Sequence, residues 1–148
     1  MHDADALSLS VLVLAAANAL VDKIHSGVVA RGFTDLRPAH GFAFVRLAPS
    51  GATISELAAH MGVTRQAAAQ LTDELVAKGY VERRPHPDDG RAQLVILTEK
   101  GWACTRAADQ AAADAVGSWA AVVGEDRLRA MRGDLAAIAA PGRLRPIW

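Results

Sequence analysis

Apolar residues recur with a helical period through residues 53–78, in two segments separated by Gly62. In the second segment, one stripe at i, i+3, i+4 and i+7 predicts the buried face of a helix; it consists of Ala68, Leu71, Thr72 and Leu75. The opposite face is predicted to be exposed; it carries Gln66, Ala69, Gln70 and Asp73. After Gly79 the pattern changes to two strand-like runs, residues 81–84 and 92–97.

The residues that bound these segments are typical of helix ends and tight turns. Thr53 and Glu56 have the spacing of a capping box, which predicts a helix start. Gly62 suits the left-handed position that ends a helix, and Thr64 suits the N-cap of the next one. Residues 85–90 are dense in turn formers and predict a hairpin between the two strands. Two helices, a tight turn and a hairpin predict a winged helix-turn-helix.

This stretch resembles the DNA-binding core of the MarR family of transcription regulators. The resemblance rests on the run SELAAHMGVTRQAAAQLTDELVAKGYVERR, on Asp89-Gly90-Arg91, and on Leu97-Thr98 after it. It covers about a third of the chain. The resemblance implies a homodimer joined by its N- and C-terminal helices, with the winged motifs contacting double-stranded DNA.

The flanking segments are predicted to be helical. Helices are expected over residues 4–30, from about Pro38, from Glu99 until Gly124, and over residues 127–139. The predicted fold is mainly α with a small β wing. The chain is interpreted as a single MarR-like domain, with dimerisation helices in residues 1–50 and 99–148 around a winged helix-turn-helix in residues 51–98.

The first helix is apolar on nearly all sides, so we expect it to be buried against more than one neighbour. Its uncharged run, residues 6–21, is shorter than the ~20 residues that a membrane span needs. No signal peptide is recognised, because Asp3 and Asp5 occupy the region that would carry positive charge. The prediction is therefore a cytoplasmic protein, an obligate homodimer, without a membrane anchor.

Charge alone does not favour DNA binding. The 16 basic and 16 acidic residues give a formal net charge of zero. Residues 53–98 contain five basic and six acidic side chains. DNA-binding domains usually carry a basic footprint. An alternative therefore stays open, namely a winged-helix module that binds another protein and not DNA.

The predicted DNA contacts combine the exposed helix face with the wing. Gln66 and Gln70 lie four residues apart, and glutamine can pair with the N6/N7 edge of adenine in the major groove. Both could equally be ordinary solvated side chains. The family resemblance places Arg91 in the minor groove with Asp89 bracing it. The predicted set is Thr64, Arg65, Gln66, Ala69, Gln70, Arg84, Asp89 and Arg91.

The resemblance also implies a pocket for a small aromatic or carboxylate effector where the dimer helices meet the winged motif. The predicted lining is His25, His40, Phe44, Arg46 and Trp102. Both histidines could instead be partly buried core residues. The single Cys104 excludes an internal disulfide and is interpreted as a small core residue. No zinc spacing, cofactor motif or nucleophile motif is recognised, so no metal, cofactor or enzymatic activity is predicted.

Overall fold

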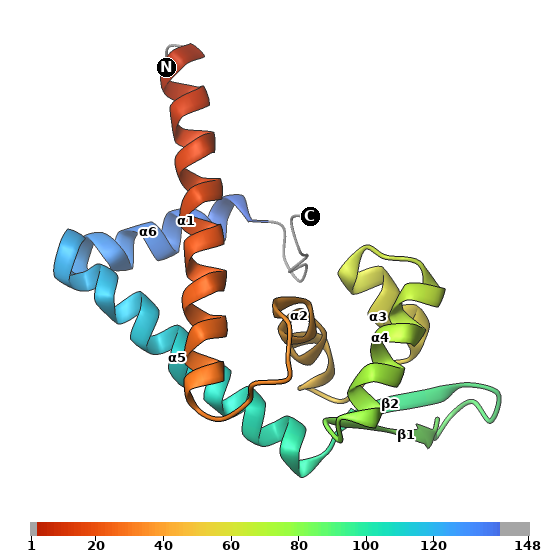
Figure 1. Ribbon diagram of the computed structural model, residues 1–148. Helices are drawn as coiled ribbons and strands as arrows, with labels where there is room; N and C mark the ends of the chain where they lie inside the picture. The colour runs from red at the N-terminus through yellow and green to blue at the C-terminus, as the bar shows by residue number, and fades with distance from the viewer. Residues whose placement is uncertain (1–2, 140–148) are drawn as a thin grey trace.

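The computed structural model describes residues 3–139 (Figure 1). Residues 140–148, the end of the predicted C-terminal dimerisation segment, lie outside this range. Six helices and two strands follow one another along the described chain: α1 (Asp3–Ala30), α2 (Pro38–Leu47), α3 (Ile54–Met61), α4 (Arg65–Ala77), β1 (Val81–Pro85), β2 (Gln93–Leu97), α5 (Glu99–Val123) and α6 (Glu125–Ile138). The prediction of a mainly helical winged helix-turn-helix fold is confirmed.

Local hydrogen bonds explain where the central helices begin and end. The Thr53 hydroxyl accepts from the Glu56 amide, and the Glu56 carboxylate accepts from the Thr53 amide at 2.8 Å. Thr64 caps α4 through the Ala67 amide at 3.1 Å. Gly62 ends α3 at φ +66°, a left-handed conformation that glycine adopts without steric cost. These contacts span three or four residues, which is why the sequence predicts them.

The wing is an antiparallel pair of strands in which Val81 is opposite Leu97 and Pro85 is opposite Gln93. Ala52, between α2 and α3, forms a further bridge with Val95. Val81, Val95 and Leu97 face the core, and alternate residues of both strands point outward. The wing is thus attached to the helix-turn-helix by its apolar face, and its outer face and loop are left for contact with a partner.

The core of the winged domain lies between α2, α3, α4 and the wing. Its largest completely buried side chains include Tyr80, Leu47, Leu57 and Leu75. The Tyr80 ring packs against Phe44, with ring centroids 5.7 Å apart. The Tyr80 hydroxyl donates to Asp35 Oδ1 at 2.6 Å. Burial and this carboxylate raise the Tyr80 pKa, so the hydroxyl stays protonated and keeps donating.

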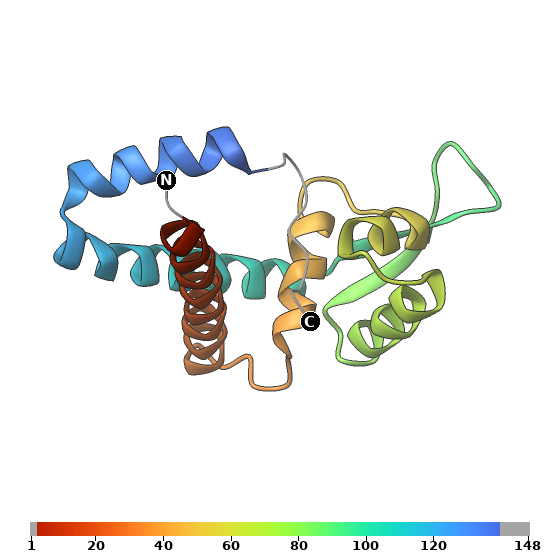
Figure 2. The same cartoon turned by 90° about the horizontal axis from the view of Figure 1, so that it is seen from above.

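Helices α1, α5 and α6 form a separate arm (Figures 1 and 2). The C-terminal half of α1 packs on α5 at very short range, because a Cβ on Gly27 would lie 2.6 Å from the Cβ of Ala111. Helix α6 folds back from α5 after Gly124. It begins two residues before the predicted Arg127, because Gly124 at φ +85° serves as both the end of α5 and the N-cap of α6.

The N-terminal half of α1 extends past the region in which α1 packs on α5 (Figure 1). Within one chain Leu7 is 68% exposed and Leu12 is 62% exposed, so the single chain does not supply the burial against several neighbours that is expected for this helix. By length and composition, residues Leu7–Ala30 could also cross a membrane. This stretch is longer than the uncharged run of residues 6–21 because it includes the charged pair Asp22 and Lys23. One such helix is weak support for a membrane span, since a core helix of an assembly has the same composition.

Candidate DNA-binding surface and ligand cavity

Helix α4 presents a polar face to solvent. Ala68, Thr72 and Leu75 are buried against the core, which turns Gln66 and Gln70 outward on the opposite side. Both amides are exposed, and neither forms a hydrogen bond with another part of residues 3–139. Ala69, which lies between them along the chain, is half-buried, so its small side chain projects little from the helix. Two side-chain amides that lie one helical turn apart, without hydrogen bonds to the rest of the described chain, can bind the edges of neighbouring base pairs.

The N-terminus of α4 lies at the end of this face. Thr64 and Arg65 are both exposed, and the Thr64 hydroxyl is used as the N-cap. The next backbone amides at a helix N-terminus have no partner in the helix and attract anions such as phosphate. The structure therefore brings the predicted contacts Thr64, Arg65, Gln66, Ala69 and Gln70 together on one end and face of α4.

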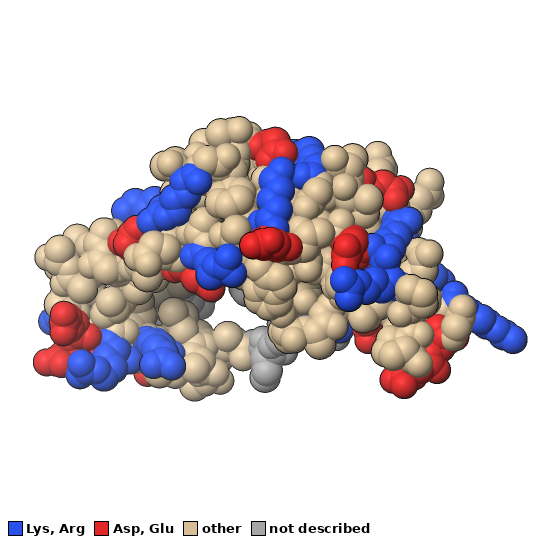
Figure 3. All heavy atoms as spheres, turned by 90° about the horizontal axis from the view of Figure 1, so that it is seen from below, with Lys and Arg blue, Asp and Glu red and all other residues tan. Residues whose placement is uncertain are grey.

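Acidic side chains near this face are largely paired. Asp73 of α4 accepts from Arg83 of β1 at 2.7 Å, and Glu82 pairs with Arg84 along β1. Arg84, a predicted DNA contact, is exposed but is already engaged by Glu82. Figure 3 shows basic and acidic side chains interspersed over this side of the molecule, without a surface of one sign. Exposed pairs of this kind contribute ~0–1 kcal/mol, so a phosphate can replace the carboxylate at small cost.

The wing loop is ordered by its own hydrogen bonds. Asp89 Oδ1 accepts from the backbone amide of Arg91 at 2.9 Å, and the Asp89 carbonyl accepts from the Ala92 amide. Asp89 therefore fixes the loop backbone, and no ion pair between its carboxylate and the Arg91 guanidinium is formed among the described residues. The Arg91 side chain is exposed at the loop that extends away from the domain (Figure 2).

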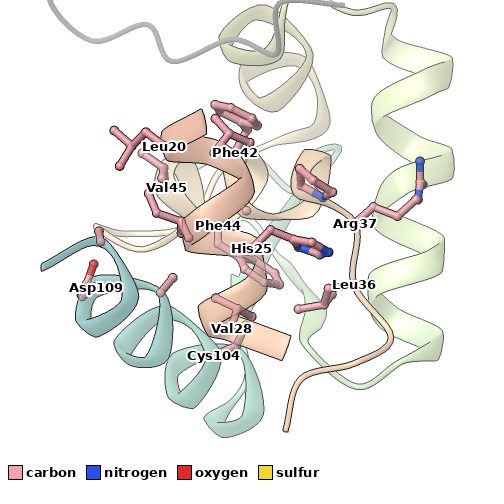
Figure 4. Close-up of a pocket in the computed structure, with 16 residues that line it drawn as sticks. Leu20, His25, Val28, Leu36, Arg37, Phe42, Phe44, Val45, Cys104 and Asp109 are labelled. Carbon is pink, nitrogen blue, oxygen red and sulfur yellow. The ribbon is translucent and has the colours of Figure 1, made fainter. Parts of the chain in front are cut away.

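An apolar cavity of about 340 Å³ lies between α1, α2 and α5 (Figure 4). Of the five predicted ligand contacts, His25 and Phe44 line it. Its apolar walls include Val28, Leu36 and Phe42. Its polar groups are His25, Arg37 and Asp109, on three different elements. Clefts with apolar walls and few polar groups are the usual form of small-molecule sites.

His40 does not line the cavity. It is completely buried, with Nδ1 accepting from the Arg37 amide at 2.9 Å and Nε2 lying 3.2 Å from Glu74 Oε2. Burial lowers the His40 pKa, while the Glu74 carboxylate opposes this shift. The bonds to Arg37 and His40 lower the pKa of Glu74. This arrangement agrees with the alternative reading of His40 as a hydrogen-bonded core residue.

Arg46 and Trp102 also lie outside the cavity wall. Arg46 donates to the Gly51 carbonyl at 3.0 Å and pairs with Glu56 at 3.5 Å, so it fixes the connection between α2 and α3. Trp102 is 42% exposed on α5. The predicted grouping of His25, His40, Phe44, Arg46 and Trp102 in one pocket is therefore corrected, because only two of them face the same space.

Cys104 lies at the cavity wall and is almost completely buried. Burial raises the pKa of its thiol to about 11. The thiol therefore stays protonated at neutral pH and is a poor nucleophile, since the thiolate is the reactive form. The interpretation of Cys104 as a small core residue fits this environment.

A second apolar surface follows the inner faces of α5 and α6. The residues that line the groove between these helices include Val116, Trp119, Leu128, Met131 and Leu135. No side chain of α6 is buried in the single chain, and Ile138 is 79% exposed. Apolar helix faces of this size are typical of protein–protein contacts.

The comparison with known proteins follows this geometry. Residues 35–92, which run from the cavity wall to the wing loop, match the MarR family model. The match covers about two fifths of the chain, and over this segment the chain is similar to the MarR family.

The relatives found by sequence are named as uncharacterized proteins. The protein Rv2011c of Mycobacterium tuberculosis and Mb2034c of Mycobacterium bovis are each 35% identical to it over 86 residues. The match covers 53% of this chain and 60% of either relative, so the chain spans well under two thirds of their length.

Solved MarR-family structures share the fold. MarR from Escherichia coli, without ligand, has a TM-score of 0.74 at 23% identity, covering 89% of this chain and 96% of that one. The repressor CouR bound to a 23-mer DNA duplex has a TM-score of 0.72 at 25% identity, covering 89% and 92%. CouR from Rhodococcus jostii bound to p-coumaroyl-CoA has a TM-score of 0.67 at 23% identity, covering 92% and 94%.

The sequence did not predict most of the residues that line the cavity. Leu36 and Arg37 belong to the connection before α2, where no periodic pattern indicates which way a side chain points, and Pro38 is the first residue of α2. Asp109 and Ala112 belong to α5, whose alanine-rich sequence gives little contrast between its faces. The one available signal was Pro38, a residue typical of the first turn of a helix, which marks where the connection ends.

Proposed function

We propose that this protein is a homodimeric, ligand-responsive transcription regulator that binds a near-palindromic double-stranded DNA operator and acts as a repressor. One observation supports the proposal of DNA binding. The side-chain amides of Gln66 and Gln70 form no hydrogen bond within the described residues and lie on the exposed face of α4, beside an ordered wing whose loop exposes Arg91. The neutral surface around them predicts modest affinity, with a salt dependence that comes from the few exposed arginines such as Arg65 and Arg91. Such a function implies a cytoplasmic location.

Dimerisation is supported by the unpartnered apolar faces of α1, α5 and α6. A second copy of the same chain offers the same faces, and a two-fold axis lets each projecting α1 cover the groove of its partner. This arrangement would give the burial that the composition of α1 requires. It would also place two recognition helices side by side, which matches an operator with two half-sites.

The proposal that the protein responds to a ligand is supported by the cavity between α1, α2 and α5. Its volume suits a small, largely apolar molecule, and we propose an aromatic or carboxylate effector. Because α1 and α5 belong to the proposed dimer arm and α2 to the winged domain, a ligand there contacts both parts. Such a ligand changes DNA affinity only if it binds two arrangements of these parts with different affinity.

The test of DNA binding is selection from a random double-stranded library, followed by gel shift with the enriched duplex and a scrambled duplex. Retention of the enriched duplex at lower protein concentration supports the proposal. The second candidate is a protein-interaction module, favoured by the zero net charge and by the pairing of Arg83 and Arg84 with acids. Equal, weak binding of both duplexes would favour this second candidate.

A further inference from the structure

The end of the connection between α1 and α2, together with the first turn of α2, contacts two functional parts of the protein at once. On one side, Leu36, Arg37 and Pro38 form part of the cavity wall. On the other side, Asp35, Arg37 and His40 bond to α4 and the residues that follow it. We refer to residues 35–40 as the coupling segment.

The bonds of the coupling segment to α4 converge on one carboxylate oxygen. Glu74 Oε2 lies 2.7 Å from Arg37 Nη2 and 3.2 Å from His40 Nε2. His40 Nδ1 accepts from the Arg37 amide, so the neutral ring carries its proton on Nε2 and donates it to Glu74. In Figure 4 the Arg37 side chain extends away from the cavity, toward α4.

Glu74 is well placed to move the DNA-facing residues. It lies one helical turn after Gln70, and side chains four residues apart are neighbours on a helix. The start of the coupling segment is fixed separately, since Asp35 accepts from the Tyr80 hydroxyl and its carbonyl accepts from Lys78. A displacement of the cavity wall therefore acts mainly on the Arg37 and His40 bonds to Glu74.

We infer that the coupling segment transmits occupancy of the cavity to α4 through Glu74. A molecule that fills the cavity displaces Leu36 and Pro38, and the Arg37 and His40 bonds to Glu74 are weakened as the segment moves. Helix α4 then loses one of its restraints, and the positions of Gln66 and Gln70 become less defined. The path from the cavity to α4 through Glu74 rests on the observed contacts. Its effect on DNA affinity rests on the proposed DNA-binding function.

The experiment measures linkage between the two sites. The probe is 2-naphthol, an uncharged fluorescent aromatic, and the DNA is the duplex that the wild-type protein selects. Two coupled sites change each other's affinity by the same factor, typically about fivefold or more. For the wild type, the expected result is that DNA weakens naphthol binding and naphthol weakens DNA binding by one common factor of that size.

Variants identify the route. Glu74→Ala should reduce the coupling factor to less than about twofold, while naphthol still binds. Glu74→Gln, whose amide oxygen still accepts from His40, should fold like the wild type and retain a reduced factor. Asp73→Ala is the matched control, because it removes an α4 ion pair of the same length whose partner, Arg83, does not line the cavity. It should keep the wild-type factor.

Three results would overturn the inference: no naphthol binding, no mutual effect in the wild type, or equal loss of coupling in Asp73→Ala and Glu74→Ala. Failure of the DNA-binding proposal is recognised separately, as absence of any selected duplex. In that case, hydrogen exchange still tests the route. Naphthol should speed amide exchange over residues 70–77 in the wild type and not in Glu74→Ala, and unchanged exchange in both would contradict the inference.

Discussion

His40 is the residue at which burial and charge are most closely balanced. Its ring is completely buried, with one nitrogen accepting from Arg37 and the other donating to Glu74. Protonation of Nδ1 would break the bond to the Arg37 amide and place a second positive charge near Arg37 and Lys78. The carboxylate of Glu74 opposes this effect, but burial prevails and the pKa of His40 is lowered.

The first prediction follows from this shift. A histidine with a lowered pKa in the folded state binds a proton more readily when unfolded, so stability is lost as pH falls through its ordinary value of about 6.5. The free energy of unfolding should therefore decrease between roughly pH 7.5 and 5.5. His40→Gln, which can still donate to Glu74, should flatten this decrease. Denaturant titrations at several pH values measure the effect.

The acidic groups with lowered pKa do not interfere in this window. The stability that Asp35, Glu56 and Glu74 contribute through their lowered pKa values is lost only when the pH falls to about 4 and below, near the ordinary pKa of a carboxyl group. An unchanged pH dependence in His40→Gln would mean that another group is responsible. Steeper dependence in the variant would contradict the direction of the His40 shift.

Single residues were predictable from the sequence where their partners are close along the chain. The caps Thr53, Thr64 and Thr98 bond to amides three residues away, so a sequence window contains both partners. The Arg37–Glu74 and Arg83–Asp73 pairs depend on how elements pack, and no local pattern identifies them. Trp102 shows the same limit, since the family resemblance implied that it lines a pocket, but the packing of α5 leaves it exposed.

At the scale of elements, α4 and the wing have different surfaces for contact. The exposed face of α4 is neutral, with amides that can form paired hydrogen bonds with base edges. The wing carries the exposed positive charge of Arg91 on a loop held by Asp89. The sequence predicted both elements because their patterns are strong, whereas the proposed roles of the two surfaces remain to be separated by experiment.

The second prediction separates these roles. Gln70→Ala should reduce the preference for the selected duplex over scrambled DNA by ~1–3 kcal/mol, with little change in salt dependence. Arg91→Ala should weaken binding to both duplexes, because a cation near the backbone recognises groove shape and charge more than base identity. It should also reduce the slope of log affinity against log salt by up to about one unit per subunit.

Anisotropy titrations of both duplexes at several salt concentrations measure these effects. Arg127→Ala on α6 is the matched control for Arg91→Ala, since it removes an exposed arginine that lies outside the wing and does not line the groove between α5 and α6. Unchanged affinity and slope in Arg91→Ala would show that the wing does not contact DNA. The interaction-module alternative would then be favoured.

At the scale of the whole molecule, the winged domain is complete and the arm is not. The buried apolar residues gather around Tyr80, Leu57 and Val95, whereas α6 and those side chains in the N-terminal half of α1 that the structure describes are not buried in the single chain. The sequence indicated that α1 needs several neighbours. It could not indicate which neighbours, because a membrane, a second copy and another protein all cover an apolar helix.

The last prediction decides among these by changing the apolar surface of α1. Leu12 is 62% exposed in one chain, and in a symmetric dimer each substitution acts twice. Burying a leucine contributes ~1.5–3 kcal/mol, so Leu12→Glu should cost the dimer at least ~3 kcal/mol, or roughly a hundredfold in dissociation constant. Val76→Glu is the control, since Val76 is an exposed apolar residue of α4, outside the arm.

Sedimentation equilibrium should show a wild-type dimer at micromolar concentration, dissociation of Leu12→Glu, and an unchanged dimer for Val76→Glu. The unfolding temperature of the wild type should also rise with protein concentration, because association stabilises only the folded chain. A folded wild-type monomer at micromolar concentration would contradict the dimer, and recovery of the protein with lipid vesicles would instead assign α1 to a membrane.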